Sequence, residues 1–205
     1  MLSLEQITRR QFHAAALAGG AAALLGRQPG AWAQEAKKEE PLYGPGVSLR
    51  GMRVFPADNP WNRDISQRPV DRLSARILKR IGLDMPLHPD FGTVWNGLPN
   101  GLPYVVVPGN QPKVPVKFRY TAESDRGLYP IPPDAPIEGG GNFKCDRHVL
   151  VVDRDHGMLY ELFDARPVAG GKYWEAEGGA IFDLKSNRLR PEGWTSADAA
   201  GLPIF

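Results

Sequence analysis

The stretch HVLVVDRDHGMLYELFD, residues 148–164, decides the fold class. Two apolar runs, residues 148–153 and 158–164, are joined by a short polar segment that ends at Gly157. Runs of this length that are rich in Val, Leu and aromatic residues and end at turn residues are typical of strands. Gly157 can adopt the positive φ that a longer hairpin turn requires. The stretch therefore predicts a β-hairpin.

Residues on both sides of this hairpin extend the β pattern. Residues 104–107 form an apolar run between two prolines, and residues 115–120 alternate apolar and basic side chains, as strands do. Residues 172–177 and 180–184 predict a second hairpin that turns at a glycine pair. Between these strands, residues 123–141 are rich in Pro and Gly and predict a long loop, a feature that is often functional or mobile.

One helix is predicted in the body of the chain, over residues 70–81. Apolar side chains recur there at helical spacing and define one face: Val70, Leu73, Ile77, Leu78 and Ile81. Asp71 suits the first turn and Gly82 suits the C-terminal end. Together these patterns predict a mostly β fold, either a sandwich or a partly closed barrel, with one N-terminal helix.

The first 33 residues predict an export signal. The pair Arg9-Arg10 precedes an apolar stretch, residues 12–25, and residues 31–33 then give the small-residue pattern that signal peptidase accepts. An arginine pair with Phe two positions later resembles a twin-arginine signal, which would make the twin-arginine translocase a partner during export. An ordinary secretory signal is the alternative. The apolar stretch is shorter than the roughly 20 strongly apolar residues of a membrane span.

The remainder of the chain is expected to form one domain. We divide the sequence into a signal at 1–33, a flexible linker at 34–50 and a single β-rich domain at 51–205. After cleavage of the signal no stable membrane span is expected, so we expect the mature protein to be periplasmic or extracellular.

Charge and cysteine content narrow the classes of partner. Three arginines and one glutamate lie in the predicted signal, so the 25 basic and 23 acidic residues of the chain leave 22 of each sign in the mature part. A neutral chain argues against nucleic acid as the main partner, because that would require a basic patch. Cys145 is the only cysteine, which excludes an intramolecular disulfide.

Five stretches resemble an uncharacterised family of secreted bacterial proteins: FPADNPWN (55–62), LHPDFG (87–92), PIEGG (136–140), DRHVLVVD (146–153) and GWTSADAAGLPI (193–204). The resemblance covers most of the mature chain but implies no reaction. It implies that relatives continue beyond Phe205, so that this chain is truncated at its C-terminus. It also implies an association with glycan-related domains in multi-module secreted proteins. In the family pattern a glycine precedes the Asp-Arg-His run, where this chain has Cys145.

The candidate catalytic residues are Glu138, Asp146 and His148. Asp146 and His148 are two positions apart at the start of a predicted strand, so we expect both side chains to project from the same face. Glu138 adjoins a glycine run that permits close approach of a ligand. A carboxylate beside an imidazole can orient the ring for general acid–base chemistry or metal binding. The alternative is that Asp146 pairs with Arg147 in a surface turn while His148 fills a strand edge.

Other chemistries remain open at this stage. His88 and Asp90 could join His148 in a zinc or iron site, but their spacing does not require one, and no metal or cofactor is assigned. Cys145 as a nucleophile with His148 is disfavoured, because the two side chains are expected to point to different faces. A glycosidase needs two carboxylates roughly 5–9 Å apart. The candidates for such a pair are Glu123, Asp125, Glu138, Glu161, Glu175 and Asp183.

Tryptophans beside polar or flexible residues suggest sugar binding. Flat rings with neighbouring amides suit stacking plus a few polar contacts. We predict that Trp174, Trp194 and Asp198 bind substrate, Asp198 following Trp194 in the last of the five stretches. The alternative is that these tryptophans belong to the core or anchor loops, and Trp61 is expected to anchor the N-terminal segment.

Two functions are therefore expected from the sequence. The first is an exported module that interacts with glycans such as polysaccharide or peptidoglycan, either as a hydrolase or lyase that cleaves them or by binding alone. The second is a non-catalytic structural or binding protein of the cell envelope. Whether the protein is an enzyme stays open.

Overall fold

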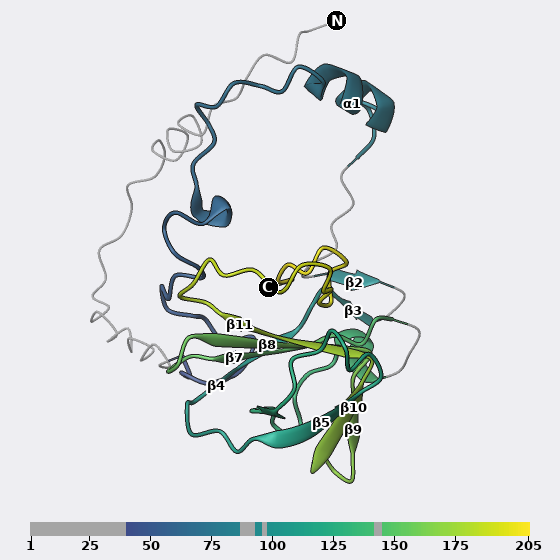
Figure 1. Cartoon of the computed structure of the whole chain (residues 1–205). Coiled ribbons are helices and arrows are strands. Elements are labelled where there is room, and N and C mark those ends of the chain that lie inside the picture. Colours follow the sequence, from purple (N-terminus) through teal and green to yellow (C-terminus); the bar gives the residue numbers. More distant parts are fainter. Residues whose placement is uncertain (1–39, 87–92, 96–97, 142–144) are drawn as a thin grey trace, which may run out of the picture. The chain divides into compact units, whose positions relative to one another are not determined.

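Short strands make up most of the regular structure in the computed structural model, which describes residues 40–86, 93–95, 98–141 and 145–205 (Figure 1). These ranges belong to one structural unit, Glu39–Phe205. The predicted signal at 1–33 lies outside the described residues. Among the described residues no helix is long and apolar enough to cross a membrane.

The described part of the chain contains one α-helix, two 3-10 turns and a series of strands. The strands are β1 (Gly44–Pro45), β2 (Thr93–Trp95), β3 (Leu98–Asn100), β4 (Tyr104–Val107), β5 (Val114–Phe118), β6 (Leu128–Tyr129), β7 (Val149–Asp153), β8 (Met158–Phe163), β9 (Arg166–Val168), β10 (Tyr173–Ala176) and β11 (Gly178–Asp183). The helical elements are η2 (Pro60–Asn62), α1 (Ser74–Ile81) and η3 (Glu138–Gly141).

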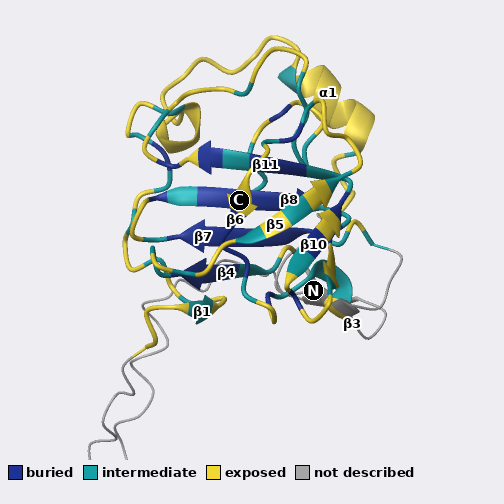
Figure 2. Ribbon diagram, turned by 60° about the horizontal axis from the view of Figure 1, so that its bottom comes forward, coloured by how far each residue is buried: buried dark blue, intermediate teal, exposed yellow. Residues whose placement is uncertain are grey.

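Two mixed sheets form a sandwich-like arrangement. The five-stranded sheet has the order β1-β4-β7-β8-β11, and the four-stranded sheet has the order β6-β5-β10-β9. Strands β5 and β10 lie across β7 and β8 (Figure 2). Strands β2 and β3 form a separate hairpin. The mostly β fold with one helix is thus confirmed, and the described strands form no closed barrel.

The predicted hairpin over residues 148–164 is confirmed. Strands β7 and β8 pair antiparallel, with Val151 opposite Tyr160. Gly157 has a φ of 68°, and its N–H donates to the carbonyl of Asp153 at 2.8 Å. The turn therefore uses the left-handed conformation that glycine adopts without steric cost.

The second predicted hairpin is wrong, although both of its strands exist. Strand β10 pairs in parallel with β5, placing Trp174 opposite Val116, whereas β11 pairs antiparallel with β8. The chain passes from one sheet to the other at Glu177, whose N–H donates to the carbonyl of Phe163. Apolar alternation predicts that a segment is extended, but the partner of each strand lies in a distant part of the sequence.

The core has two layers, one on each face of the five-stranded sheet. Alternate residues of β4, β7 and β8 face the second sheet and pack around the buried Trp174 and Tyr129. The other face is covered by the segment leading to Phe55 and by Phe205, which lies edge-on to Tyr104 with ring centroids 5.4 Å apart. Each fully buried aliphatic side chain contributes roughly 1.5–3 kcal/mol, so these layers dominate the stability of the fold.

Helix α1 is confirmed but begins later than predicted, at Ser74. The Asp71 carboxylate accepts the N–H of Leu73 at 2.7 Å and forms a turn before the helix. Gly82, with a φ of 107°, follows the last helical residue. The apolar face does not pack on the described residues: Ile77 is 53% exposed and Ile81 is 64% exposed.

Part of the predicted flexible linker at 34–50 contacts the domain. Gly44 and Pro45 form the edge strand β1, paired with Val106 and Val105 of β4. The hydroxyl of Tyr104 also donates to the carbonyl of Val47 at 2.9 Å. The described end of this segment is therefore held on the sheet.

Candidate functional site

Glu138, Asp146 and His148 come together, as the sequence predicts. His148 Nε2 lies 3.8 Å from Asp146 Oδ2 and 3.9 Å from Glu138 Oε2. One imidazole nitrogen thus faces two carboxylates at distances longer than a direct hydrogen bond. In the absence of substrate, catalytic groups are often this loosely arranged and tighten on binding.

The backbone fixes Glu138 against His148. The N–H of Glu138 donates to the carbonyl of His148 at 3.0 Å, and the N–H of His148 donates to Glu138 Oε2 at 3.3 Å. These two bonds join η3 to the start of β7. The Glu138 carboxylate is therefore held beside the imidazole by main-chain hydrogen bonds.

A close contact at Gly139 shapes the same corner. Gly139 has a φ of 72°, and a Cβ added to it would overlap the sulfur of Cys145. The thiol of Cys145 donates to the carbonyl of Glu138 at 3.2 Å. Cys145 thus packs under the glycine turn and hydrogen-bonds to its backbone.

Asp146 and His148 meet for a different reason from the one that the sequence suggests. Strand β7 starts at Val149, and Arg147 has a φ of 50°, so the segment 146–148 is not extended. The N–H of Asp164 donates to the carbonyl of Asp146 at 2.8 Å and holds this turn. A left-handed residue between the two side chains, and not strand alternation, brings them to the same side.

Burial divides the three side chains into different environments. The His148 side chain is 8% exposed, that of Glu138 is 22% exposed and that of Asp146 is 71% exposed. His148 Nδ1 is buried and has no hydrogen-bond partner among the described residues. The His148 ring also packs against Phe163, with ring centroids 5.7 Å apart. A buried imidazole nitrogen without a partner is costly, and such groups are enriched at functional sites.

Trp174 and Asp198, which are predicted to bind substrate, both make contacts within the fold. Trp174 is 0% exposed in the core between the sheets, so its ring presents no face to a ligand. The Asp198 carboxylate accepts the N–H groups of Ala200 and Leu202 at 2.9 and 3.2 Å and organises a turn.

Trp194 and Trp61 lie in contrasting environments. Trp194 is partly buried, and the guanidinium of Arg190 lies 5.3 Å from its ring centroid. Trp61, expected to be an anchor, is instead 77% exposed. Among the tryptophans whose side chains the structure describes, the most exposed is thus Trp61, which is not one of the residues predicted for the site.

A metal site is not indicated by the described residues. They contain no group of three His, Cys, Asp or Glu side chains that could hold an ion. His88 and Asp90, considered above as ligands, lie outside the described residues. His156 Nδ1 lies 2.8 Å from the buried carboxylate of Asp153, which accounts for that histidine within the hairpin turn.

Glu161 is an unusual carboxyl group that sequence reasoning named only as one of several acids. It is 0% exposed in β8, and its Oε1 accepts the N–H of Ile204 at 2.8 Å. Its Oε2 has no partner among the described residues. Burial raises the pKa of Glu161 to about 8, although the Ile204 hydrogen bond and the charge of Arg190 act in the opposite direction. In the sequence, only the position of Glu161 within an apolar strand pattern indicates that its carboxyl group is buried.

Comparison with known proteins does not extend these observations. No protein-family model, no curated protein and no solved structure matches this chain.

Proposed function

We propose that this is an exported protein that cleaves glycans by proton transfer at His148. The observation that carries the proposal is the meeting of His148 Nε2 with the carboxylates of Glu138 and Asp146, both within 4 Å. The predicted export signal supports a periplasmic or extracellular location, and the resemblance to secreted bacterial proteins supports a glycan substrate.

Each residue has a defined role in this proposal. His148 is the proton-transfer group, because an imidazole can both accept and donate a proton. Glu138 is a positioning residue, since its backbone and carboxylate are bonded to the main chain of His148. Asp146 faces the substrate, because its carboxylate is 71% exposed next to the ring.

A specific observation favours a second function, a non-catalytic binding protein of the cell envelope. The His148 side chain is only 8% exposed and packs on Phe163. On this alternative the three residues stabilise the corner between η3 and β7, and their removal affects stability and not turnover.

The test is turnover of polysaccharides and peptidoglycan by the full-length chain, measured as new reducing ends. His148→Ala and Asp146→Asn are compared with His156→Ala, which alters a histidine of the β7–β8 turn. We expect both site variants to lose at least about 100-fold in rate, the usual contribution of general acid–base catalysis, and the control to keep its rate. Because the Asp146 side chain is largely exposed, we expect Asp146→Asn to fold like the wild type, and thermal unfolding checks this.

Two results would overturn the proposal. One is full turnover by folded Asp146→Asn and His148→Ala, and the other is the absence of turnover by the wild type on all substrates. In the second case the binding alternative takes its place.

A further inference from the structure

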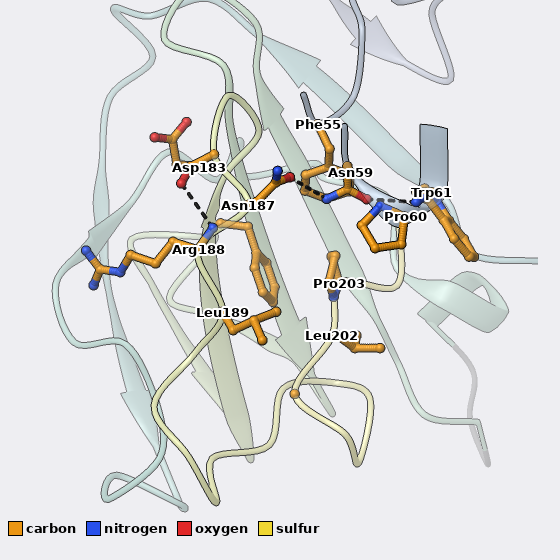
Figure 3. A pocket seen from close by; sticks show the side chains of 13 residues that line it. Phe55, Asn59, Pro60, Trp61, Asp183, Asn187, Arg188, Leu189, Leu202 and Pro203 are labelled. Atoms are coloured by element: carbon orange, nitrogen blue, oxygen red, sulfur yellow. Dashed lines mark hydrogen bonds between the residues drawn. The ribbon is translucent and has the colours of Figure 1, made fainter. Parts of the chain in front are cut away.

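A second candidate site lies between the segment that carries Trp61 and the C-terminal part of the chain. A cavity of about 240 Å³ opens there, and none of Glu138, Asp146 and His148 lines it. Figure 3 shows Leu189 opposite Leu202, with the hydrogen-bonded amides of Asn59 and Asn187 above them. The cavity is thus a separate site with apolar walls and a polar amide pair.

The segment that forms one wall is held in a strained conformation. Phe55 has a φ of 64°, which is unfavourable for a residue with a side chain, and its ring is buried. The Asn62 side-chain amide donates to the carbonyls of Val54, Phe55 and Pro56 at 2.8, 3.1 and 3.0 Å. Strain of this kind persists where the surroundings fix it, and it is enriched at binding sites. This wall of the cavity is therefore preorganised for ligand binding.

The two amides have hydrogen-bond donors left over. Asn59 Nδ2 donates to Asn187 Oδ1 at 2.8 Å, and Asn187 Nδ2 donates to Asp58 Oδ1 at 3.0 Å. Asn59 Oδ1 accepts the backbone N–H of Trp61 at 2.9 Å. Each amide nitrogen carries two hydrogens and uses one, so each keeps one N–H that has no acceptor among the described residues, while both amide oxygens already accept a hydrogen bond.

Trp61 adds a third donor and a flat surface. Its side chain is 77% exposed, and its indole N–H has no acceptor among the described residues. The charged side chains of the lining, Asp183 and Arg188, point away from the cavity in Figure 3. The polar groups that face a ligand are therefore neutral, and unused donors are in excess.

This combination defines the chemistry of the ligand. The unused neutral donors can hydrogen-bond to uncharged acceptor oxygens of a ligand. The apolar walls can pack against a small apolar group, and the exposed indole can stack on a flat face. An acetamido group supplies a carbonyl acceptor and a methyl group together, and a pyranose ring supplies the face. A uronic acid would bring a carboxylate into a cavity with no inward-facing cation.

We infer that this cavity, which we call the Trp61 groove and which Trp61, Asn59 and Asn187 line, binds an N-acetylated amino sugar of a glycan chain. The indole stacks on the sugar ring, the amides donate to the acetamido carbonyl and the methyl group packs near Leu189. This inference rests on the proposed function only for the choice of a glycan, since the site is distinct from the His148 site.

The test is calorimetric binding of the full-length chain to β-1,4-linked N-acetylglucosamine tetramer. The de-acetylated tetramer and the glucose tetramer share its backbone but lack the acetamido group. We expect each of these to bind at least about tenfold more weakly. Equal affinity for the three tetramers, or no binding of the acetylated one, would overturn the inference.

Variants locate the binding in the groove. Trp61→Ala is expected to weaken binding of the acetylated tetramer at least about tenfold, and Trp61→Phe is expected to restore part of it by keeping a flat ring. Leu128→Ala, which truncates another exposed apolar side chain on β6, serves as the control with unchanged affinity. Because Trp61 is largely exposed, its removal leaves the core intact, and thermal unfolding verifies this. Unchanged binding by Trp61→Ala would contradict the inference.

The two proposals can fail separately. His148→Ala should keep the affinity for the acetylated tetramer, because His148 does not line the groove. Loss of turnover without loss of binding in that variant supports both proposals. If turnover depends on His148 but tetramer binding does not depend on Trp61, the inference about the groove is wrong and the proposed function stands.

Discussion

Replacing Glu161 by Gln should make the stability of this protein much less dependent on pH. In the folded protein burial raises the pKa of Glu161 from 4.5 to about 8. The folded state therefore favours the protonated carboxyl group, whereas the unfolded chain releases the proton at its ordinary pKa. Stability from the protonated form is fully present below pH 4.5 and is lost as the pH rises through 8.

The size of this effect follows from the difference between the two pKa values. Each unit of difference corresponds to about 1.4 kcal/mol, so the wild type loses about 5 kcal/mol from acid pH to pH 9, most of it between pH 5 and 8. Glutamine carries no charge at any pH and keeps an oxygen that can accept the Ile204 N–H. Its added N–H₂ group is buried, which costs roughly 1–3 kcal/mol at every pH.

Urea unfolding at pH 5, 7 and 9 measures the free energy of unfolding of the full-length wild type and of Glu161→Gln. Glu161→Gln is expected to be less stable than wild type at pH 5 and more stable at pH 9. Glu175→Gln, at an exposed position of β10, is the control and should follow the wild-type pH profile. Parallel profiles for wild type and Glu161→Gln would refute the reasoning, since they would mean that Glu161 is ionised in the folded protein.

Two further substitutions test packing beside the site and in the core. Gly139→Ala should lower the melting temperature far more than Gly140→Ala. Both positions have positive φ, but only a Cβ at 139 would overlap the Cys145 sulfur. Thermal unfolding of the two variants measures the difference, and equal shifts in melting temperature would contradict the expected overlap. Trp174→Ala should destabilise the protein by about 3–5 kcal/mol in urea unfolding because its ring fills the core, whereas a loss under 1 kcal/mol would mean that the ring is not buried there.

Local sequence patterns predict the elements of this fold better than their partners. The 148–164 hairpin is correct because its strands are adjacent and joined by a turn with a glycine at the required position. The second hairpin fails because β10 and β11, although adjacent, pair with strands far away in the sequence. Helix α1 follows its periodic pattern, yet that pattern could not tell that its apolar face stays exposed.

In the candidate site, too, the sequence predicts local features better than tertiary contacts. Chemistry and proximity in the sequence suggested Glu138, Asp146 and His148, and the described structure brings them together. The sequence could not show that Trp174 is buried while Trp61 is exposed, because both are aromatic residues beside polar or glycine-rich segments. Exposure depends on the tertiary partners of each segment, which one sequence does not specify.

The parallel pairings within both sheets bear on how the chain acquires its structure. Tyr104 of β4 pairs with Leu150 of β7, and Val116 of β5 pairs with Trp174 of β10, so each pairing closes a long loop. Closing such loops costs chain entropy before many contacts form, which slows folding. The five-stranded sheet cannot be completed before β11 has been synthesised, nor the four-stranded sheet before β10. We therefore expect both sheets to be completed late in folding, after the local β7–β8 hairpin has formed.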